Sequence, residues 1–132
     1  MPLLLDASVW VAAAEPRQTH HAEAGALVES SVPVASLDLT FFEIANALGV
    51  KLGKPQRARL ILETLLIRCG KQIVRVDSEL IVAALDHASS HGLTAYDAAY
   101  VAIAQSNGWT LVSTDIQDLV SKGLAVAPDA AV

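Results

Sequence analysis

Short apolar segments alternate with longer helical patterns along the whole chain, and this rhythm restricts the fold more than any other feature. Strands separated by helical patterns of about 10–15 residues are typical of βαβ units and a mainly parallel sheet. We therefore predict an α/β protein, a three-layer α/β/α sandwich that forms one domain over residues 1–132. The predicted strands cover residues 3–5, 32–35, 73–76, 109–112 and 124–127.

The helices are predicted from their end signals and from apolar residues at three-and-four spacing. Asp77 and Thr94 suit N-cap positions, Pro55 suits a first helical position, and Gly92 and Gly108 suit the residues that end helices. The predicted helices cover residues 9–14, 20–29 with Thr19 as cap, 41–52 with Asp38 or Thr40 as cap, a segment from Pro55 onward, 78–91, 95–106 and 115–120.

Composition excludes several classes of protein. With 53% hydrophobic residues, the chain can bury a sizeable core and is not disordered. Its longest unbroken apolar stretches fall well short of the roughly 18 residues of a membrane span, and its N-terminus lacks the basic start of a secretory signal. The single cysteine, Cys69, excludes a disulfide framework and a cysteine-based zinc site. Together these observations predict a cytoplasmic protein.

The charge balance bears on nucleic-acid binding. The chain has 9 Lys and Arg against 14 Asp and Glu, a net charge of −5. A protein that reads DNA through phosphate contacts needs a basic face, so this balance argues against a simple DNA binder. It is compatible with a metal-dependent nuclease, which needs a cluster of acids. The basic cluster of Lys51, Lys54, Arg57 and Arg59 forms either a solvated turn or a phosphate-contacting rim.

Acidic residues stand at positions where such a fold can build a site. Asp6 and Asp115 follow predicted strands, and ligands of open α/β sheets bind outside the carboxyl ends of the strands. Glu43 and Asp97 lie within apolar helical stretches, where a buried charge needs a partner or a metal. Each acid also has a simpler interpretation: Asp6 and Asp115 as helix caps, Glu43 and Asp97 as solvent-facing residues. If all of them converge, carboxylate-only ligation favours Mg²⁺ or Mn²⁺.

Four segments in order resemble the PIN-domain ribonucleases, and most closely the VapC-type toxins of toxin–antitoxin pairs. The segments are Leu3-Leu4-Leu5-Asp6-Ala7-Ser8, Glu43-Ile44-Ala45-Asn46, residues 93–104 with Tyr96-Asp97-Ala98-Ala99-Tyr100, and Leu111-Val112-Ser113-Thr114-Asp115. The resemblance implies an endoribonuclease that depends on Mg²⁺ or Mn²⁺. The residues that it implies for the site are the acids Asp6, Glu43, Asp97 and Asp115, with the polar side chains of Ser8, Asn46 and Ser113 beside them.

The same resemblance implies how the site works and which partners the protein has. Asp6 and Asp97 are the most direct metal ligands, with Glu43 and Asp115 binding directly or through water. The expected partners are an RNA substrate, a second copy in a homodimer, and a VapB-type antitoxin that covers the acidic pocket. DNA is contacted only through that antitoxin. Asp118 is either a fifth acid of the pocket or a solvent-facing residue.

Other functions stay open at this point. One alternative is a PIN-fold interaction module that has lost catalysis, although the intact set of acids argues against it. Another is a PIN nuclease of RNA processing. A phosphoacceptor receiver domain needs an acidic pair near the first strand, where Asp6 stands alone.

Overall fold

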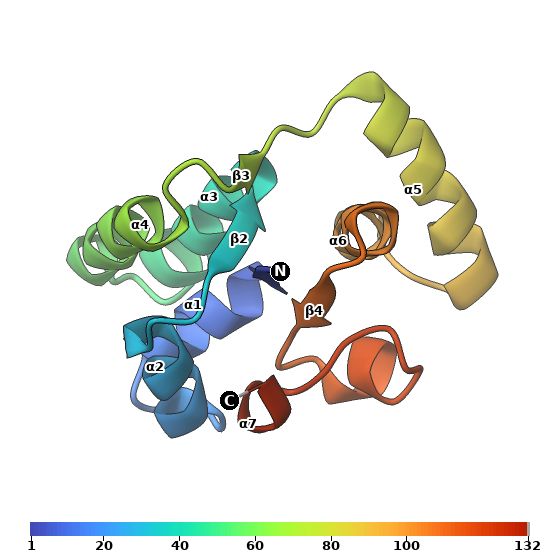
Figure 1. Ribbon diagram of the computed structural model, residues 1–132. Coiled ribbons are helices and arrows are strands. Elements are labelled where there is room, and N and C mark those ends of the chain that lie inside the picture. Colours follow the sequence, from blue (N-terminus) through green and yellow to red (C-terminus); the bar gives the residue numbers. More distant parts are fainter. Residues whose placement is uncertain (132) are drawn as a thin grey trace.

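The computed structural model describes residues 1–131, in which helices cover both faces of a four-stranded parallel sheet (Figure 1). The strand order is β3-β2-β1-β4, so β1 lies in the middle and pairs Leu4 with Ala35 on one side and with Leu111 on the other. The predicted three-layer α/β/α sandwich with a mainly parallel sheet is confirmed. The strands are β1 (Leu3–Leu5), β2 (Val34–Leu37), β3 (Ile73–Val74) and β4 (Thr110–Val112).

The helical elements follow the predicted order. α1 to α4 precede β3, and α5 and α6 connect β3 to β4. The bounds are α1 (Ala7–Ala14), α2 (His21–Glu29), α3 (Asp38–Ile44), the π-helix η1 (Ala45–Lys51), α4 (Pro55–Cys69), α5 (Ser78–His91), α6 (Ala95–Asn107), the π-helix η2 (Ile116–Val120) and α7 (Pro128–Ala131).

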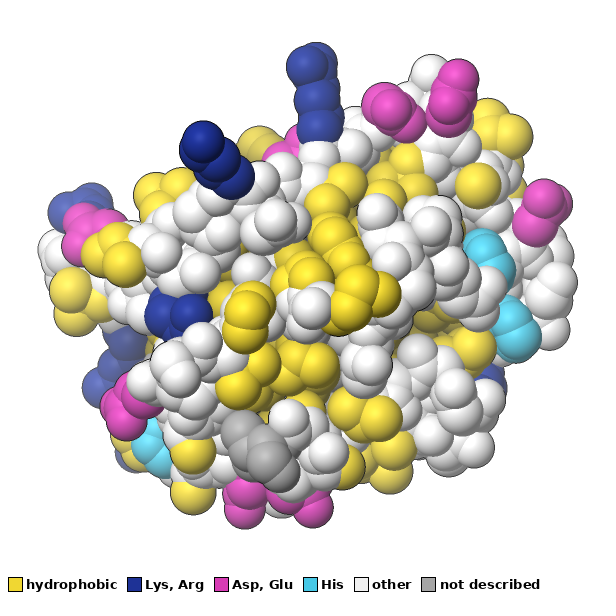
Figure 2. All heavy atoms as spheres, viewed as in Figure 1, with side chains coloured by type: hydrophobic (Ala, Val, Ile, Leu, Met, Phe, Trp, Pro, Cys, Tyr) yellow, Lys and Arg dark blue, Asp and Glu magenta, His cyan; other side chains and the backbone are white. Residues whose placement is uncertain are grey.

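Alternating side chains of the short strands build a separate core on each face of the sheet. Leu5 and Val112 pack with α1, α2 and α4 on one face, whereas Leu4 and Leu111 pack with α6 on the other. This period of two is what a sheet buried on both sides requires. Charged side chains lie mainly around the margin of the face shown in Figure 2, where hydrophobic side chains fill the middle. None of the helices within residues 1–131 has the length and apolar character needed to cross a membrane.

The predicted strand ends were wrong at four places. The strand predicted over 32–35 is displaced to Val34–Leu37, since Pro33 has no N–H and only its carbonyl joins the sheet, accepting from Leu3 N at 3.0 Å. The strands predicted over 73–76 and 109–112 are shorter by two residues and by one. The strand predicted over 124–127 is reduced to one bridge between Val112 and Val126, because Pro128 starts α7.

Some predicted caps were also wrong. α2 has His20 rather than Thr19 at its N-cap, and α3 has Leu37 there rather than Asp38 or Thr40. Thr40 instead accepts the N–H of Leu37 at 3.1 Å. The helix predicted over 41–52 changes from α to π geometry after Ile44. The helix predicted over 115–120 is a π-helix over Ile116–Val120.

A buried hydroxyl ties α1 to the middle of the sheet, and its removal should be costly. Ser36 is fully buried, accepts the indole N–H of Trp10 at 2.9 Å and donates to the carbonyl of Leu5 at 2.8 Å. Ser36→Ala leaves that N–H without a partner, so we expect the free energy of unfolding in urea to fall by about 1–3 kcal/mol. The exposed Ser89 of α5 provides the control variant Ser89→Ala. Equal stability of the two variants would contradict the prediction.

Candidate active site

The parallel pairing of β1 with β4 brings two predicted site residues to one edge of the sheet. The backbone N–H of Asp6 donates to the carbonyl of Val112 at 3.2 Å, so Asp6 lies beside the segment that begins with Ser113. Asp6 is 5% exposed, and its carboxylate accepts the N–H of Val9 at 3.4 Å. Asp6 is therefore the N-cap of α1 as well as a buried acid at the carboxyl edge of the sheet.

Two serine hydroxyls join the ends of these strands. Ser8 donates to Asp6 Oδ1 and accepts the backbone N–H of Thr114 at 3.0 Å. Ser113 is fully buried, lies 3.4 Å from the hydroxyl of Ser8 and accepts the N–H of Asp115 at 3.0 Å. These bonds fix the loop after β4 against Asp6.

The other acids come from three further elements. Glu43 lies on α3 and accepts the hydroxyl proton of Tyr100 at 2.7 Å. Asp97 lies in the first turn of α6, whose N-cap Thr94 accepts the N–H of Asp97 at 3.1 Å. Asp115 is the N-cap of η2 and accepts the N–H of Asp118 at 3.0 Å. The capping alternative for Asp115 therefore holds alongside its place at the site.

The pKa values of these acids show that their charges act on one another. The pKa of Asp6 is raised to about 7, mainly by burial and also by the charges of Asp97 and Glu43, against the hydrogen bonds of the two serines. Burial, and then the charge of Asp97, raises the pKa of Glu43 in spite of the Tyr100 bond. Burial, Asp115 and Asp118 raise the pKa of Asp97. The predicted acids thus form one repelling set, with Asp118 exposed at its margin.

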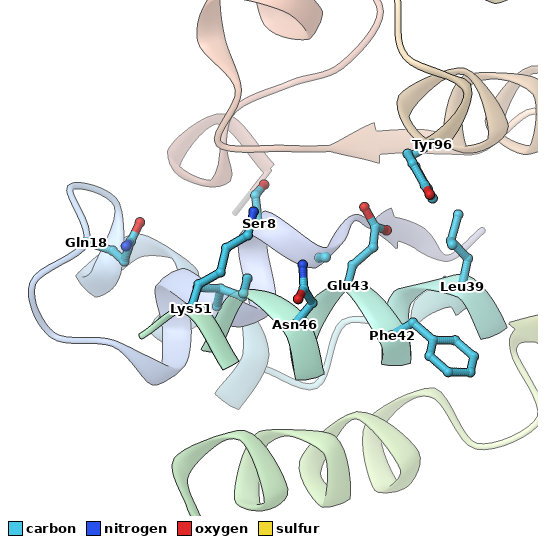
Figure 3. Close-up of a pocket in the computed structure, with 11 residues that line it drawn as sticks. Ser8, Gln18, Leu39, Phe42, Glu43, Asn46, Lys51 and Tyr96 are labelled. Atoms are coloured by element: carbon cyan, nitrogen blue, oxygen red, sulfur yellow. The ribbon is translucent and has the colours of Figure 1, made fainter. Parts of the chain in front are cut away.

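A groove of about 570 Å³ runs beside this set along α3 and η1, and we call it the α3 groove (Figure 3). Glu43 projects into it from α3, Ser8 lines it from α1, and Lys51 lines it from the end of η1. Its lining residues are Ala7, Ser8, Val11, Gln18, Leu39, Phe42, Glu43, Asn46, Ala47, Lys51 and Tyr96. Asp6, Asp97 and Asp115 are not among them, so the groove reaches the acidic set at Glu43 and lies next to Asp6 only through Ser8.

The four predicted basic residues do not form one surface. Lys51 lines the α3 groove, but Arg59 lines a different groove between η1 and α4. Lys54 and Arg57 pair with the buried carboxylate of Glu15 at the end of α1, Arg57 Nη1 at 3.1 Å from Glu15 Oε2. The Lys54 bond lowers the pKa of Glu15, which keeps this carboxylate ionised at neutral pH.

The four carboxylates offer the oxygen donors that a hard divalent cation prefers. Within residues 1–131, no group of three or more Asp, Glu, His or Cys side chains stands close enough to hold a metal ion as placed. Mg²⁺ characteristically keeps several waters and binds one or two carboxylates together with substrate phosphates. A carboxylate whose pKa is raised by burial and by neighbouring charges, as that of Asp6 is by Asp97 and Glu43, gains most from a cation that neutralises it.

Fold and site together define an α/β/α protein with a set of mutually repelling carboxylates at the carboxyl edge of its sheet. The family model described as PIN domain matches residues 3–119. The chain belongs to the PIN-domain family.

Individual relatives agree with this assignment. The chain is 33% identical to Ribonuclease VapC3 of Pyrobaculum aerophilum over 121 residues, which cover 89% of this chain and 92% of that protein. The structure resembles VapC20 of Mycobacterium tuberculosis, described as a sarcin-ricin loop cleaving toxin, with a TM-score of 0.74 at 20% identity over 92% of this chain and 95% of that one. It also resembles a chain of a toxin–antitoxin complex from Klebsiella pneumoniae, with a TM-score of 0.69 at 20% identity over 96% and 97% of the chains.

Proposed function

We propose that this protein is a Mg²⁺- or Mn²⁺-dependent endoribonuclease and the toxin of a VapBC-type toxin–antitoxin module. The observation that carries the proposal is the set of Asp6, Glu43, Asp97 and Asp115: burial raises the pKa values of Asp6, Glu43 and Asp97, and the charges of other acids of the set raise them further. Membership of the PIN-domain family and the likeness to a VapC ribonuclease supply the substrate class.

Each acid has a defined part in the proposal. Asp6 and Asp97 would hold the cation, Glu43 and Asp115 would complete the site directly or through water, and a nearby carboxylate would orient the attacking water. When bound, the cation polarises the scissile phosphate and lowers the pKa of a bound water. Ser8 and Ser113 hold Asp6 in place through the hydrogen bonds described above, and Asn46 presents its amide to the α3 groove.

The direct test is cleavage of total cellular RNA by the purified, partner-free chain. We expect cleavage with Mn²⁺ or Mg²⁺ and none in EDTA. A folded chain that neither cleaves RNA nor binds Mn²⁺ in a calorimetric titration would contradict the proposal and favour the non-catalytic interaction module. Metal-dependent cleavage confined to one precursor RNA would instead favour a PIN nuclease of RNA processing.

Lys51 is the basic residue that the proposal assigns to an RNA phosphate next to the scissile one. It lines the α3 groove with Glu43, whereas Lys54 and Arg57 are paired with Glu15. For Lys51→Ala we expect weaker RNA binding and a salt dependence whose slope is smaller by about 0.7 to 1, as for one lost phosphate contact. Binding to a labelled single strand at several salt concentrations measures this slope. The control is Lys71→Ala, an exposed lysine before β3, and an equal change in both variants would argue against the assignment.

The proposed partners are an antitoxin and a second copy of the chain, in the cytoplasm. A basic side chain of the antitoxin would neutralise the acidic set in place of a cation. Apolar side chains exposed on α4 and α5 offer surfaces for these contacts; they are Leu60, Leu66, Ile67, Ile81, Val82 and Leu85.

A further inference from the structure

A chain of buried hydroxyl groups leads from the end of β2 to the carboxylate of Glu43. The backbone N–H of Leu37 donates to Thr40 Oγ1 at 3.1 Å, the hydroxyls of Thr40 and Tyr100 lie 2.6 Å apart, and Tyr100 donates to Glu43 Oε1 at 2.7 Å. Thr40 is fully buried and Tyr100 is 1% exposed, so water does not compete for these bonds. The sequence motif contains Tyr100, but the proposed catalytic roles make no use of it.

While Glu43 is ionised, the hydroxyl protons of Thr40 and Tyr100 can be arranged in only one way. An ionised carboxylate only accepts, so the single hydroxyl proton of Tyr100 is committed to Glu43. The bond between the two hydroxyls must then use the proton of Thr40, whose oxygen accepts from the backbone of Leu37. Every donor has one acceptor, and the chain is anchored in the backbone at the end of β2. Bonds arranged in such a series polarise and strengthen one another.

This series of hydrogen-bonded hydroxyls also links the helices that carry Glu43 and Asp97. Tyr100 lies one turn after Asp97 on α6, and Thr40 lies one turn before Glu43 on α3. The bonds between these helices therefore fix the position of Glu43 relative to Asp97. A Glu side chain on a partly exposed helix otherwise samples many rotamers. In Figure 3, Glu43 projects from α3 into the α3 groove.

We propose that Tyr100, held by Thr40, is a positioning residue that fixes the Glu43 carboxylate for the bound cation and its waters. This inference rests on the proposed function. Groups that orient metal ligands from outside typically change metal affinity or activity about 10–100-fold when removed. Tyr100 acts through Glu43 and touches neither RNA nor metal.

Tyr100→Phe tests the proposal, because it removes the hydroxyl and keeps the buried ring. We expect the Kd for Mn²⁺, measured by calorimetry without RNA, to rise about 10–100-fold and kcat at saturating Mn²⁺ to fall, with KM for RNA unchanged. Thr40→Val should change both in the same direction, and Thr40→Ser, which keeps the hydroxyl, should restore wild-type values. In a Glu43→Gln background Tyr100→Phe should have no further effect, as expected when one residue acts through the other.

The control separates positioning from stability. Ser36→Ala also removes a buried hydroxyl, yet should leave the Kd for Mn²⁺ unchanged. The inference is overturned if Tyr100→Phe binds Mn²⁺ like wild type, if Ser36→Ala weakens binding equally, or if Tyr100→Phe has its full effect without Glu43. A wild-type chain that binds no Mn²⁺ overturns the proposed function as well. A chain that binds Mn²⁺ without cleaving the RNA offered still tests the inference through the Kd.

Discussion

Asp97→Asn should abolish metal-dependent RNA cleavage and leave the protein folded. The substitution keeps the shape of the side chain and removes one of the two carboxylates proposed to bind the cation directly. Metal ions stabilise such transition states by several kcal/mol. Since each 1.36 kcal/mol is a factor of ten, we expect kcat to fall by about 10³-fold or more. A fluorescence-quenched RNA assay with Mn²⁺ at increasing concentrations measures the loss.

The matched control is Asp86→Asn, which removes an equal charge from an exposed position of α5. It should cleave RNA at the wild-type rate, because no contact joins Asp86 to the acidic set. Circular dichroism should show both variants folded, since the side chain of Asp97 forms no hydrogen bond that holds α6. Full metal-dependent activity in Asp97→Asn would show that the cation binds elsewhere.

Features of the fold that depend on local chemistry were predictable from the sequence. Asp77 and Thr94 cap α5 and α6 as expected, and Gly92 and Gly108 end these helices with φ of 64° and 66°. Such ends depend on a few neighbouring residues, so a single sequence contains the whole signal. The last strand was not predictable in this way, because its pairing depends on how far the chain after η2 runs beside β4.

In the candidate site, too, features that depend on neighbouring residues were predictable and those that depend on distant contacts were not. The positions of Asp6 and Asp115 after strands indicated the carboxyl edge of the sheet, and the parallel pairing of β1 with β4 brings them there. Spacing alone did not show that Glu43 joins them, nor that Glu15 is paired with Lys54. The bonds of Tyr100 to Thr40 and Glu43 were not predictable, because they join residues far apart in the sequence. The available signal was the place of Tyr100 one turn after Asp97.

Asp6→Asn should make the metal-free protein more stable at pH 8. The folded-state pKa of Asp6 is about 7 against an ordinary value of 3.8. Between these two pH values, the folded protein keeps a proton on Asp6 that the unfolded protein has lost. Stability therefore falls as pH rises through that window and has lost this contribution fully above pH 7. At 1.36 kcal/mol per pKa unit the loss is at most about 4 kcal/mol at pH 8. Asparagine does not titrate, and as a cap it still accepts from Val9.

Urea unfolding in EDTA at pH 5.5 to 8 should accordingly give curves that separate as pH rises, with the variant more stable at the alkaline end by about 1–4 kcal/mol. Glu43 and Asp97 remain in the variant, and their raised pKa values leave it a weaker dependence of the same sign. Mn²⁺ should reverse the order, because an ion that binds only the folded state stabilises it by mass action and the variant lacks a ligand. An Asp6→Asn protein less stable than wild type at pH 8 in EDTA would mean that the bonds of Ser8 and Ser113 outweigh the burial of the charge, and that the acidic set is not under strain.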